Sequence, residues 1–273
     1  MHSYFCLIEV GQRDGVMRKP VIGIVGNYHL INGEYPIHGA GIMNAEAISH
    51  VCGAVPMIVP TDPNIVDIND LTDVCDGFLF TGARANIHTE EYGHIPTEAH
   101  GTFDRERDRL SIPLIRRCVE VGLPVFGVCR GFQEVAVAMG CTLHPEIRDL
   151  PGRDNHRMPP DGNLADKFGR HHTVTLIPGG PFHRLWGKTE ICTNTLHGQG
   201  IMDASDKIVI DGVAPDGTPE AIYVKDAPGF TLSVQWHPEW QAGIDPVSRP
   251  LFEAFGEAAH SWANRGQKVL KRA

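Results

Sequence analysis

The stretch PVFGVCRGFQEVAVAMG, residues 124–140, decides the fold of this chain. Residues 124–128 are a short apolar run typical of a buried strand, and residues 130–139 follow as a helix that ends at Gly140. The turn between them, GVCRG at 127–131, is the G-x-nucleophile-x-G pattern with Cys129 in place of serine. A strand that passes into a helix through such a turn is typical of an α/β protein.

The rest of the chain repeats this alternation and then changes in character. Buried strands are predicted at 21–25, 55–59 and 77–80, and helices over 38–52 and from Thr102 or Asp104 to about Glu120. Strands alternating with helices predict right-handed βαβ units and a mostly parallel sheet. Beyond Gly140, strand-like runs and a last helix are predicted at 172–177, 190–193, 207–212, 220–224, 230–236 and 246–264. Residues 81–101 and 148–170 are predicted to be long loops.

The composition excludes several classes of function. The 273 residues carry 24 Lys or Arg against 33 Asp or Glu, a formal net charge of -9, whereas nucleic-acid binding needs a basic face. No run approaches the roughly 18 apolar residues of a membrane helix, so no membrane partner is expected. The seven cysteines contain no C-x-x-C pair, which favours a reducing, cytoplasmic setting. A homo-oligomer is neither indicated nor excluded.

One candidate boundary lies near the start of the chain. Met17 is followed by two basic residues and a clear strand, so residues 1–16 are interpreted as an N-terminal extension. Residues 17–273 contain no repeat, low-complexity tract or linker and are predicted to form a single domain.

The position of Cys129 suits a nucleophile. A thiol at a helix N-terminus is favoured as thiolate by the helix dipole, and the backbone N–H of Arg130 would face a developing oxyanion. The plainer interpretation, a buried structural cysteine in an ordinary turn, stays open for the pentapeptide alone.

A nucleophilic cysteine also needs a base. Near the end of the last predicted strand stands VQWHPEW, residues 234–240. A spacing of two along extended chain places His237 and Glu239 on one side, where the carboxylate can orient the imidazole. The order nucleophile, histidine, acid differs from that of α/β-hydrolases.

Together these segments resemble the class I glutamine amidotransferase superfamily, and most closely its gamma-glutamyl-gamma-aminobutyrate hydrolase branch. The resemblance covers about residues 19–264 and is carried by PVFGVCRGFQEVAVAMG, by NTLHGQG at 194–200, by APDGTPEA at 214–221 and by VQWHPEW. It implies a flavodoxin-like fold, with a central mostly parallel sheet flanked by helices and additional small antiparallel strands.

The resemblance also implies roles for individual residues. Cys129 would be the nucleophile, His237 the general base and acid, and Glu239 its orienting partner. Gly82, in the loop 81–86, and Arg130 would supply backbone donors to the oxyanion, although the family more often has Gly-Gly or Gly-Ser at Gly82-Ala83. The residues implied in substrate binding are Gln133, Asn194, Thr195, Leu196 and Asn86.

The implied activity is hydrolysis of the γ-glutamyl amide bond of a small γ-glutamyl-amine, such as gamma-glutamyl-gamma-aminobutyrate in putrescine catabolism, through a glutamyl-thioester. Neither a metal nor an organic cofactor is expected. Two alternatives stay open: a glutaminase module that supplies ammonia to a partner synthetase, and a non-catalytic member that binds a γ-glutamyl ligand. The sequence leaves the amine leaving group undefined, with Arg84 and Arg153 as candidate partners for a carboxylated amine.

Other features are given simpler interpretations. The histidines at 88, 94, 100, 171 and 172 lack zinc-site spacing and are expected to be ordinary loop residues. Asp104 and Asp108, with Arg105, Arg107 and Arg109, are expected to form a solvated helix face. Trp236 and Trp240 flank the histidine and either line an amine pocket or pack in the core.

Overall fold

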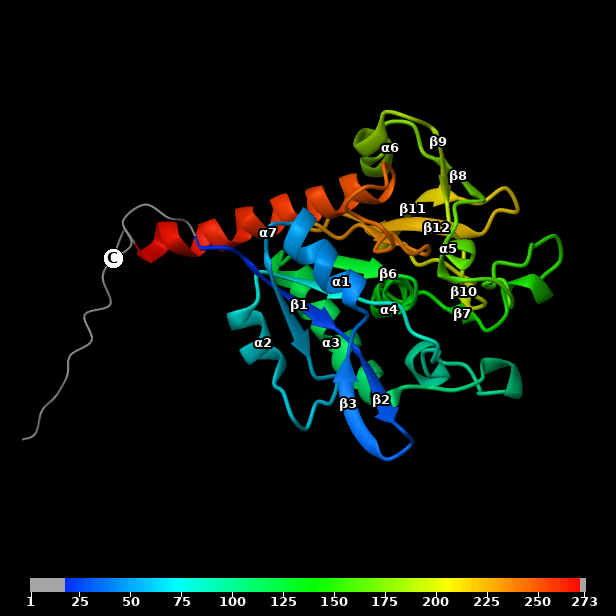
Figure 1. Ribbon diagram of the computed structural model, residues 1–273, viewed down its shortest axis with the longest axis horizontal. Helices are drawn as coiled ribbons and strands as arrows, with labels where there is room; N and C mark the ends of the chain where they lie inside the picture. The colour runs from blue at the N-terminus through cyan, green and yellow to red at the C-terminus, as the bar shows by residue number, and fades with distance from the viewer. Residues whose placement is uncertain (1–17, 271–273) are drawn as a thin grey trace, which may run out of the picture.

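The computed structural model describes residues 18–270, and its centre is a nine-stranded mixed sheet (Figure 1). The strand order is β4-β1-β5-β6-β13-β12-β11-β8-β9. The first five strands are parallel, and the remaining four continue the sheet antiparallel. Their bounds are β4 Val55–Val59, β1 Val21–Val25, β5 Gly77–Phe80, β6 Val125–Val128, β13 Ser233–Val234, β12 Pro219–Val224, β11 Ile208–Val213, β8 His172–Leu176 and β9 Glu190–Thr193.

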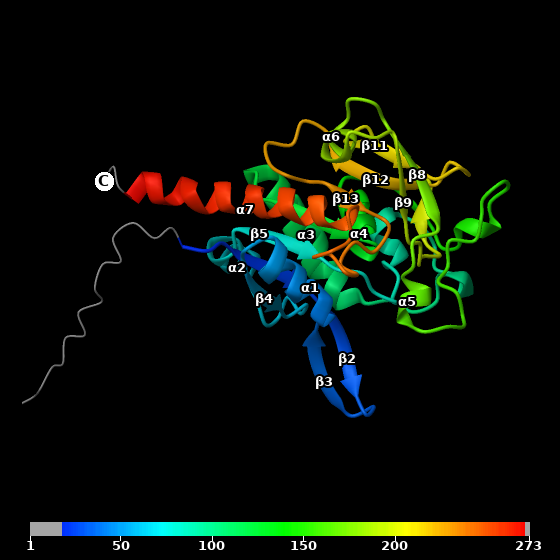
Figure 2. The ribbon, with the colours of Figure 1, turned by 45° about the horizontal axis from the view of Figure 1, so that its top comes forward.

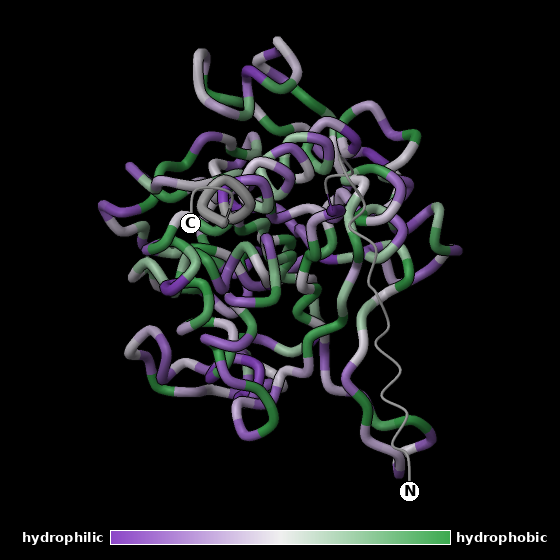
Figure 3. Tube along the Cα trace, turned by 90° about the vertical axis from the view of Figure 1, so that its left-hand side faces the viewer, coloured by the Kyte–Doolittle hydropathy of each residue, from purple (hydrophilic) through white to green (hydrophobic). Residues whose placement is uncertain are grey.

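Helices cover both faces of the parallel strands because successive strand residues alternate between two cores. Phe78 and Phe80 of β5 join the core formed with helices α2, α3 and α4, whereas Leu79 joins the core formed with η1 and α7. The bounds are α1 Ile42–Glu46 with its π-helical continuation η1 Ala47–Val51, α2 Ile68–Val74, α3 Arg105–Val121, α4 Arg130–Ala138 and α7 Ser248–Leu270. Figure 3 shows hydrophobic and hydrophilic stretches interleaved along the trace, as elements with one buried face require. The α/β fold with a mostly parallel sheet and added antiparallel strands is therefore confirmed.

The predicted strand positions in the parallel half agree closely with the structure, but the predicted helix 38–52 begins too early. A projecting hairpin, β2 Asn27–Ile31 and β3 Tyr35–Gly39, takes up its first residues (Figure 2), and the helix begins only at Ile42. Asn32 and Gly33 in the turn have φ values of 54° and 74°, the left-handed pair that a tight hairpin requires. The prediction thus missed a short-range signal.

Helix α3 begins where the sequence indicated. The side chain of Asp104 accepts a hydrogen bond from the N–H of Arg107 at 3.1 Å, so Asp104 and not Thr102 is the N-cap. Pro113 lies inside the helix rather than at its first turn.

Several short elements in the predicted loops and in the antiparallel half were not predicted. They are β7 Leu143–His144, β10 Gly200–Ile201, α5 Leu164–Lys167, α6 Pro181–Trp186, and the 3-10 turns η2 Thr89–Tyr92, η3 Glu98–His100 and η4 Ile147–Asp149. The predicted strand 230–236 shrinks to Ser233–Val234. Between residues 18 and 270, no helix is both long and apolar enough to cross a bilayer. The proposed extension 1–16 lies outside the described residues.

Candidate active site

Cys129 stands at a strained turn between β6 and α4. Its backbone has φ 52° and ψ -104°, a left-handed conformation that is rare for a residue with a side chain. The flanking glycines make this turn sterically feasible: a Cβ on Gly131 would lie 2.0 Å from the carbonyl oxygen of Phe80, and one on Gly127 would lie 2.6 Å from that of Gly131. The turn therefore fixes Cys129 at the carboxyl end of the parallel strands.

His237 and Glu239 are in contact, as predicted, but not for the predicted reason. The imidazole Nδ1 lies 2.7 Å from Glu239 Oε1. Strand β13 ends at Val234, so the two residues belong to the irregular segment after it and not to extended chain. Asn194 clamps this segment, because its Oδ1 accepts from the His237 N–H at 2.8 Å and its Nδ2 donates to the His237 carbonyl at 3.0 Å.

The structure brings the sulfur and the imidazole together against Gly82. A Cβ on Gly82 would lie 2.6 Å from His237 Cε1 and 3.4 Å from Cys129 Cβ, so any larger residue would separate the two side chains. Burial alone would lower the pKa of His237, but the Glu239 carboxylate and the adjacent Cys129 sulfur outweigh it and raise that pKa well above its usual value. The arrangement favours the protonated form of the His237 ring.

Two cavities meet at Cys129. One, of about 430 Å³, extends toward Gln133, Asn86 and Gln199. The other, of about 580 Å³, extends toward His237 and is lined by Tyr28, Met43, Leu164 and Phe168, among others. Arg84, Met158 and Leu196 border both. A substrate that reacts at the sulfur would therefore have a polar compartment on one side and a larger, more apolar one on the other.

The residues expected to bind substrate divide into two groups. Gln133, Asn86 and Leu196 line the smaller cavity, and the Gln133 Nε2 donates to the Gln199 carbonyl at 2.8 Å and to Gln235 Oε1 at 3.1 Å. Asn194 and Thr195 line neither of the two cavities: Asn194 holds the His237 backbone, and the Thr195 hydroxyl donates to the carbonyl of His156 at 3.2 Å.

The two arginines considered for the leaving group also differ. Arg84 borders both cavities, whereas Arg153 donates from Nη1 to the carbonyl of Asp216 at 2.8 Å.

A buried ionic cluster, which we call the arginine cluster (Arg107, Asp108, Arg130 and Glu134), supports the loop that carries Gly82. Arg107 pairs with Glu134 at 2.8 Å through both Nε and Nη2, and its Nη2 also donates to the carbonyl of Thr81 at 2.6 Å. The side chain of Arg130 turns away from the cavities to bind Asp108 at 2.5 Å and Glu134. The backbone N–H of Arg130 remains at the start of α4, next to Cys129.

The arginine cluster corrects part of the expected solvated helix face, because Arg105 and Arg109 are about half exposed, as predicted, whereas Arg107 and Asp108 are buried. Arg107 and Asp108 are 0% and 1% exposed, because this face of α3 packs against α4 instead of facing water. A buried helix face and a solvated one can both carry charges at i,i+4 spacing, so the charge pattern of α3 alone could not distinguish burial from exposure.

The resemblance implied the stretch 194–197 in glutamyl binding, which includes His197, but sequence reasoning missed Gln199; both residues line the smaller cavity. The buried Gln199 Nε2 has no partner within residues 18–270 and is free to donate to a ligand. Both belong to the quoted stretch NTLHGQG, so the signal was present without a residue-level assignment.

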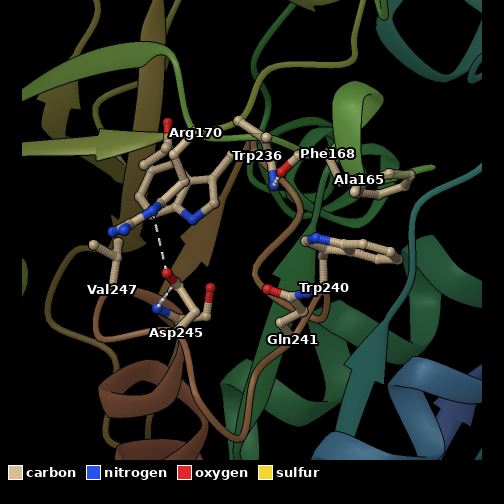
Figure 4. Close-up of a pocket in the computed structure, with 12 residues that line it drawn as sticks. Ala165, Phe168, Arg170, Trp236, Trp240, Gln241, Asp245 and Val247 are labelled. Carbon is tan, nitrogen blue, oxygen red and sulfur yellow. Dashed lines mark hydrogen bonds and ion pairs between the residues drawn. The ribbon is translucent and has the colours of Figure 1, made fainter. Parts of the chain in front are cut away.

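The two tryptophans have different surroundings. Trp236 is 1% exposed and packs in the core beneath α7. Trp240 stacks on Phe168 with ring centroids 5.1 Å apart, and Phe168 in turn meets the His237 ring edge-on at 5.5 Å. Both indoles border a separate cavity of about 150 Å³ that lies next to the Arg170–Asp245 ion pair (Figure 4).

Comparison with known proteins agrees with this site. The family model described as Peptidase C26 matches residues 20–239. The chain belongs to the peptidase C26 family. The gamma-glutamyl-gamma-aminobutyrate hydrolase of Escherichia coli O157:H7 is 32% identical over 248 residues, which cover 89% of this chain and 94% of that protein. The hydrolase PuuD of Escherichia coli K12, of the same description, is 31% identical with the same coverage.

A solved structure described as "a putative gmp synthase subunit a protein" from Thermoplasma acidophilum matches the fold. Its TM-score is 0.58 at 18% sequence identity, over 92% of this chain and 98% of that one. The similarity supports the class I glutamine amidotransferase-like fold and, at this identity, the fold alone. The predicted family and fold are therefore confirmed, while the role of each C26-family site residue remains a prediction.

Proposed function

We propose that this peptidase C26 member hydrolyses the γ-glutamyl amide bond of a small γ-glutamyl-amine. The observation that carries the proposal is that Cys129, paired with His237 and Glu239, lies where a polar and a more apolar cavity meet. An amide whose two halves differ in polarity fits across this junction, with its carbonyl at the sulfur.

The chemistry follows from the geometry in two steps. The Cys129 thiolate attacks the δ-carbonyl carbon, and the backbone N–H groups of Gly82 and Arg130 stabilise the oxyanion. His237 gives its proton to the nitrogen as the C–N bond breaks, so the amine leaves and a glutamyl-thioester remains. His237 then takes a proton from water, which attacks the thioester, releases glutamate and restores the thiol.

In this proposal the glutamyl half of the substrate lies in the smaller cavity and the amine half lies in the larger one. Gln133 and Gln199 line the smaller cavity, where the Gln133 Oε1 can accept and the unpartnered Gln199 Nε2 can donate, which suits a zwitterionic glutamyl head. Arg84 and Lys167 line the larger one, together with Asp104 and Glu239, and offer two cationic groups to a carboxylated amine such as γ-aminobutyrate. The names of the Escherichia coli relatives agree with this assignment.

The alternative, a glutaminase that passes ammonia to a synthetase, is less well supported. An ammonia leaving group occupies far less than the roughly 580 Å³ of the larger cavity. A panel of γ-glutamyl amides compared by kcat/KM tests the choice: γ-glutamyl-γ-aminobutyrate and other γ-glutamyl-amines should exceed glutamine. A preference for glutamine, raised by a partner subunit, would overturn it.

The first prediction concerns the nucleophile itself. Cys129→Ala should lower kcat by at least about 10⁴-fold, because the covalent step is lost while the cavities remain. Cys192→Ala is the matched control, since that thiol is exposed and far from the cavities. Substantial turnover by Cys129→Ala, or an equal loss in Cys192→Ala, would contradict the assignment.

A further inference from the structure

A second cluster of chemically active side chains lies behind the wall of the smaller cavity. We call it the histidine cluster: His156, His172, His197 and Glu220. Glu220 projects from β12 and His172 from β8, in the antiparallel half of the sheet (Figure 2). His156 comes from the loop 148–163, and His197 from the segment between β9 and β10. His156, His197 and Glu220 are almost fully buried, and of the four residues only His197 lines the smaller cavity with Cys129.

Three of these residues point single ligand atoms at one another. The atoms offered by His156, His197 and Glu220 all lie within 4.8 Å of each other. His156 Nδ1 is 3.4 Å and His197 Nε2 is 3.3 Å from the same oxygen, Glu220 Oε1. Zinc–nitrogen and zinc–oxygen bonds of about 2.0–2.1 Å in tetrahedral geometry give edges of about 3.3 Å between ligand atoms. The two measured separations match those edges.

The hydrogen bonds on the far side of each imidazole ring also fit a metal-binding arrangement. His197 Nδ1 lies 3.0 Å from the carbonyl oxygen of Gln199, which can only accept, so this nitrogen carries the proton. The other ring nitrogen, Nε2, is then the one that faces Glu220 Oε1 at 3.3 Å, where a bound cation could contact both atoms.

His156 has the same two-sided arrangement. Its Nε2 lies 2.8 Å from Asp216 Oδ2, which leaves Nδ1 facing Glu220. A carboxylate or carbonyl behind each imidazole is the usual outer shell of a metal-binding histidine, because it fixes the tautomer and the ring orientation.

The carboxylate itself lacks the partners that a buried anion needs. Glu220 is 0% exposed, and its Oε2 has no hydrogen-bond partner among residues 18–270. All its nitrogen neighbours gather at Oε1, where His172 Nε2 adds a third contact at 3.1 Å. The buried Oε2 is therefore a second carboxylate oxygen that stays available to a cation bound beside Oε1.

We propose that His156, His197 and Glu220 bind a divalent transition-metal ion of the zinc type, with His172 beside it. Imidazole nitrogen with one carboxylate oxygen is a donor set that suits zinc better than magnesium or calcium. The ion would join the 148–163 loop and the segment of His197 to β12, and so hold the wall of the smaller cavity in place. The site does not depend on the proposed hydrolysis at Cys129.

The experiment measures zinc binding to the full chain. A Cys129→Ser background removes the other plausible zinc ligand, the Cys129 thiolate beside His237. After one addition of Zn²⁺ and exhaustive dialysis, about one equivalent should remain by elemental analysis. X-ray absorption should show only nitrogen and oxygen neighbours at about 2.0–2.1 Å, without a sulfur at about 2.3 Å. Less than a tenth of an equivalent, or a sulfur neighbour, would overturn the proposal.

Variants locate the bound ion. His197→Ala and the near-isosteric Glu220→Gln should weaken zinc binding at least about tenfold, measured against a competing chelator, and Asp216→Asn should weaken it by about that factor through His156. His171→Ala is the matched control, since this neighbouring histidine is exposed and outside the cluster. Unchanged affinity in folded His197→Ala and Glu220→Gln would also overturn the proposal. If these variants do not fold, the absorption spectrum of the parent chain decides.

Discussion

The arginine cluster and the histidine cluster are both buried beside Cys129, yet they satisfy their charges differently. Arg107 alone donates to Glu134, Thr81, Asn27 and Gly26, so its guanidinium is almost fully used. In the histidine cluster, three ring nitrogens crowd one oxygen of Glu220 and leave the other without a partner. A closed network of fixed charges suits permanent support, whereas a cluster that leaves a buried carboxylate oxygen without a partner suits binding of a further ion.

The largest effect is expected from a substitution that breaks the arginine cluster. Glu134→Gln should lower the free energy of unfolding by about 3–5 kcal/mol, because the Arg107 guanidinium would lose its carboxylate partner and Arg130 would keep only Asp108. Urea unfolding followed by circular dichroism measures the change. A loss below about 1 kcal/mol would mean that water reaches this cluster and that its charges are not held as the structure indicates.

The contact between His237 and Glu239 should give the next largest effect. Glu239→Gln should lower kcat/KM by about 100-fold, because the imidazole loses its orienting partner. The variant should also move the basic limb of the pH profile. Glu239 raises the pKa of His237, so the protonated ring that serves the leaving amine persists to higher pH, and activity is lost as pH rises through that pKa. Without the carboxylate this loss occurs at lower pH; a shift to higher pH would contradict the assignment.

A milder effect is expected from the matched change in the histidine cluster. Glu220→Gln, measured with a chelator present, should cost about 1–2 kcal/mol, because imidazoles, unlike guanidiniums, can lose a proton when the carboxylate is removed, so that mainly hydrogen bonds are weakened. Glu134→Gln is a matched comparison, because both substitutions are near-isosteric changes of a glutamate that is 0% exposed. Equal losses in the two variants would show that the histidines are held as fixed charges too.

The smallest loss of stability is expected at an exposed ion pair. Arg249 Nε lies 2.7 Å from Glu253 Oε1 on α7, with both side chains about half exposed. Arg249→Ala should change the unfolding free energy by less than about 0.5–1 kcal/mol, since water and salt screen the pair. A loss comparable to that of Glu134→Gln would show that burial is not what separates strong from weak pairs in this chain.

What the sequence predicted well is what depends on short stretches of chain. The strands at 21–25, 55–59 and 77–80 agree with the structure because each is an apolar run with its own turn signals. The turn at Cys129 was also recognisable, since its glycines are required by atoms a few residues away and on the next strand. The hairpin at Asn32-Gly33 shows that a local signal can be outweighed by apparent helical spacing.

What could not be predicted depends on partners distant in sequence. Arg107 and Glu134 lie 27 residues apart, and no pattern in α3 indicates that its charged face meets α4. The histidine cluster joins residues up to 64 positions apart, so no short ligand spacing exists to detect. The contact of His237 with Glu239 was expected from strand geometry that the chain does not adopt, and only the pairing itself was correct.

The left-handed backbone at Cys129 means that the residue proposed to react is also one that lowers the stability of the fold. Holding a side chain at φ 52° costs on the order of 1–3 kcal/mol, an amount that glycine would not lose. Mutations toward a more stable protein at this position would therefore remove the sulfur. If the proposed role of Cys129 is correct, the strained cysteine is retained because its thiol is needed for the reaction.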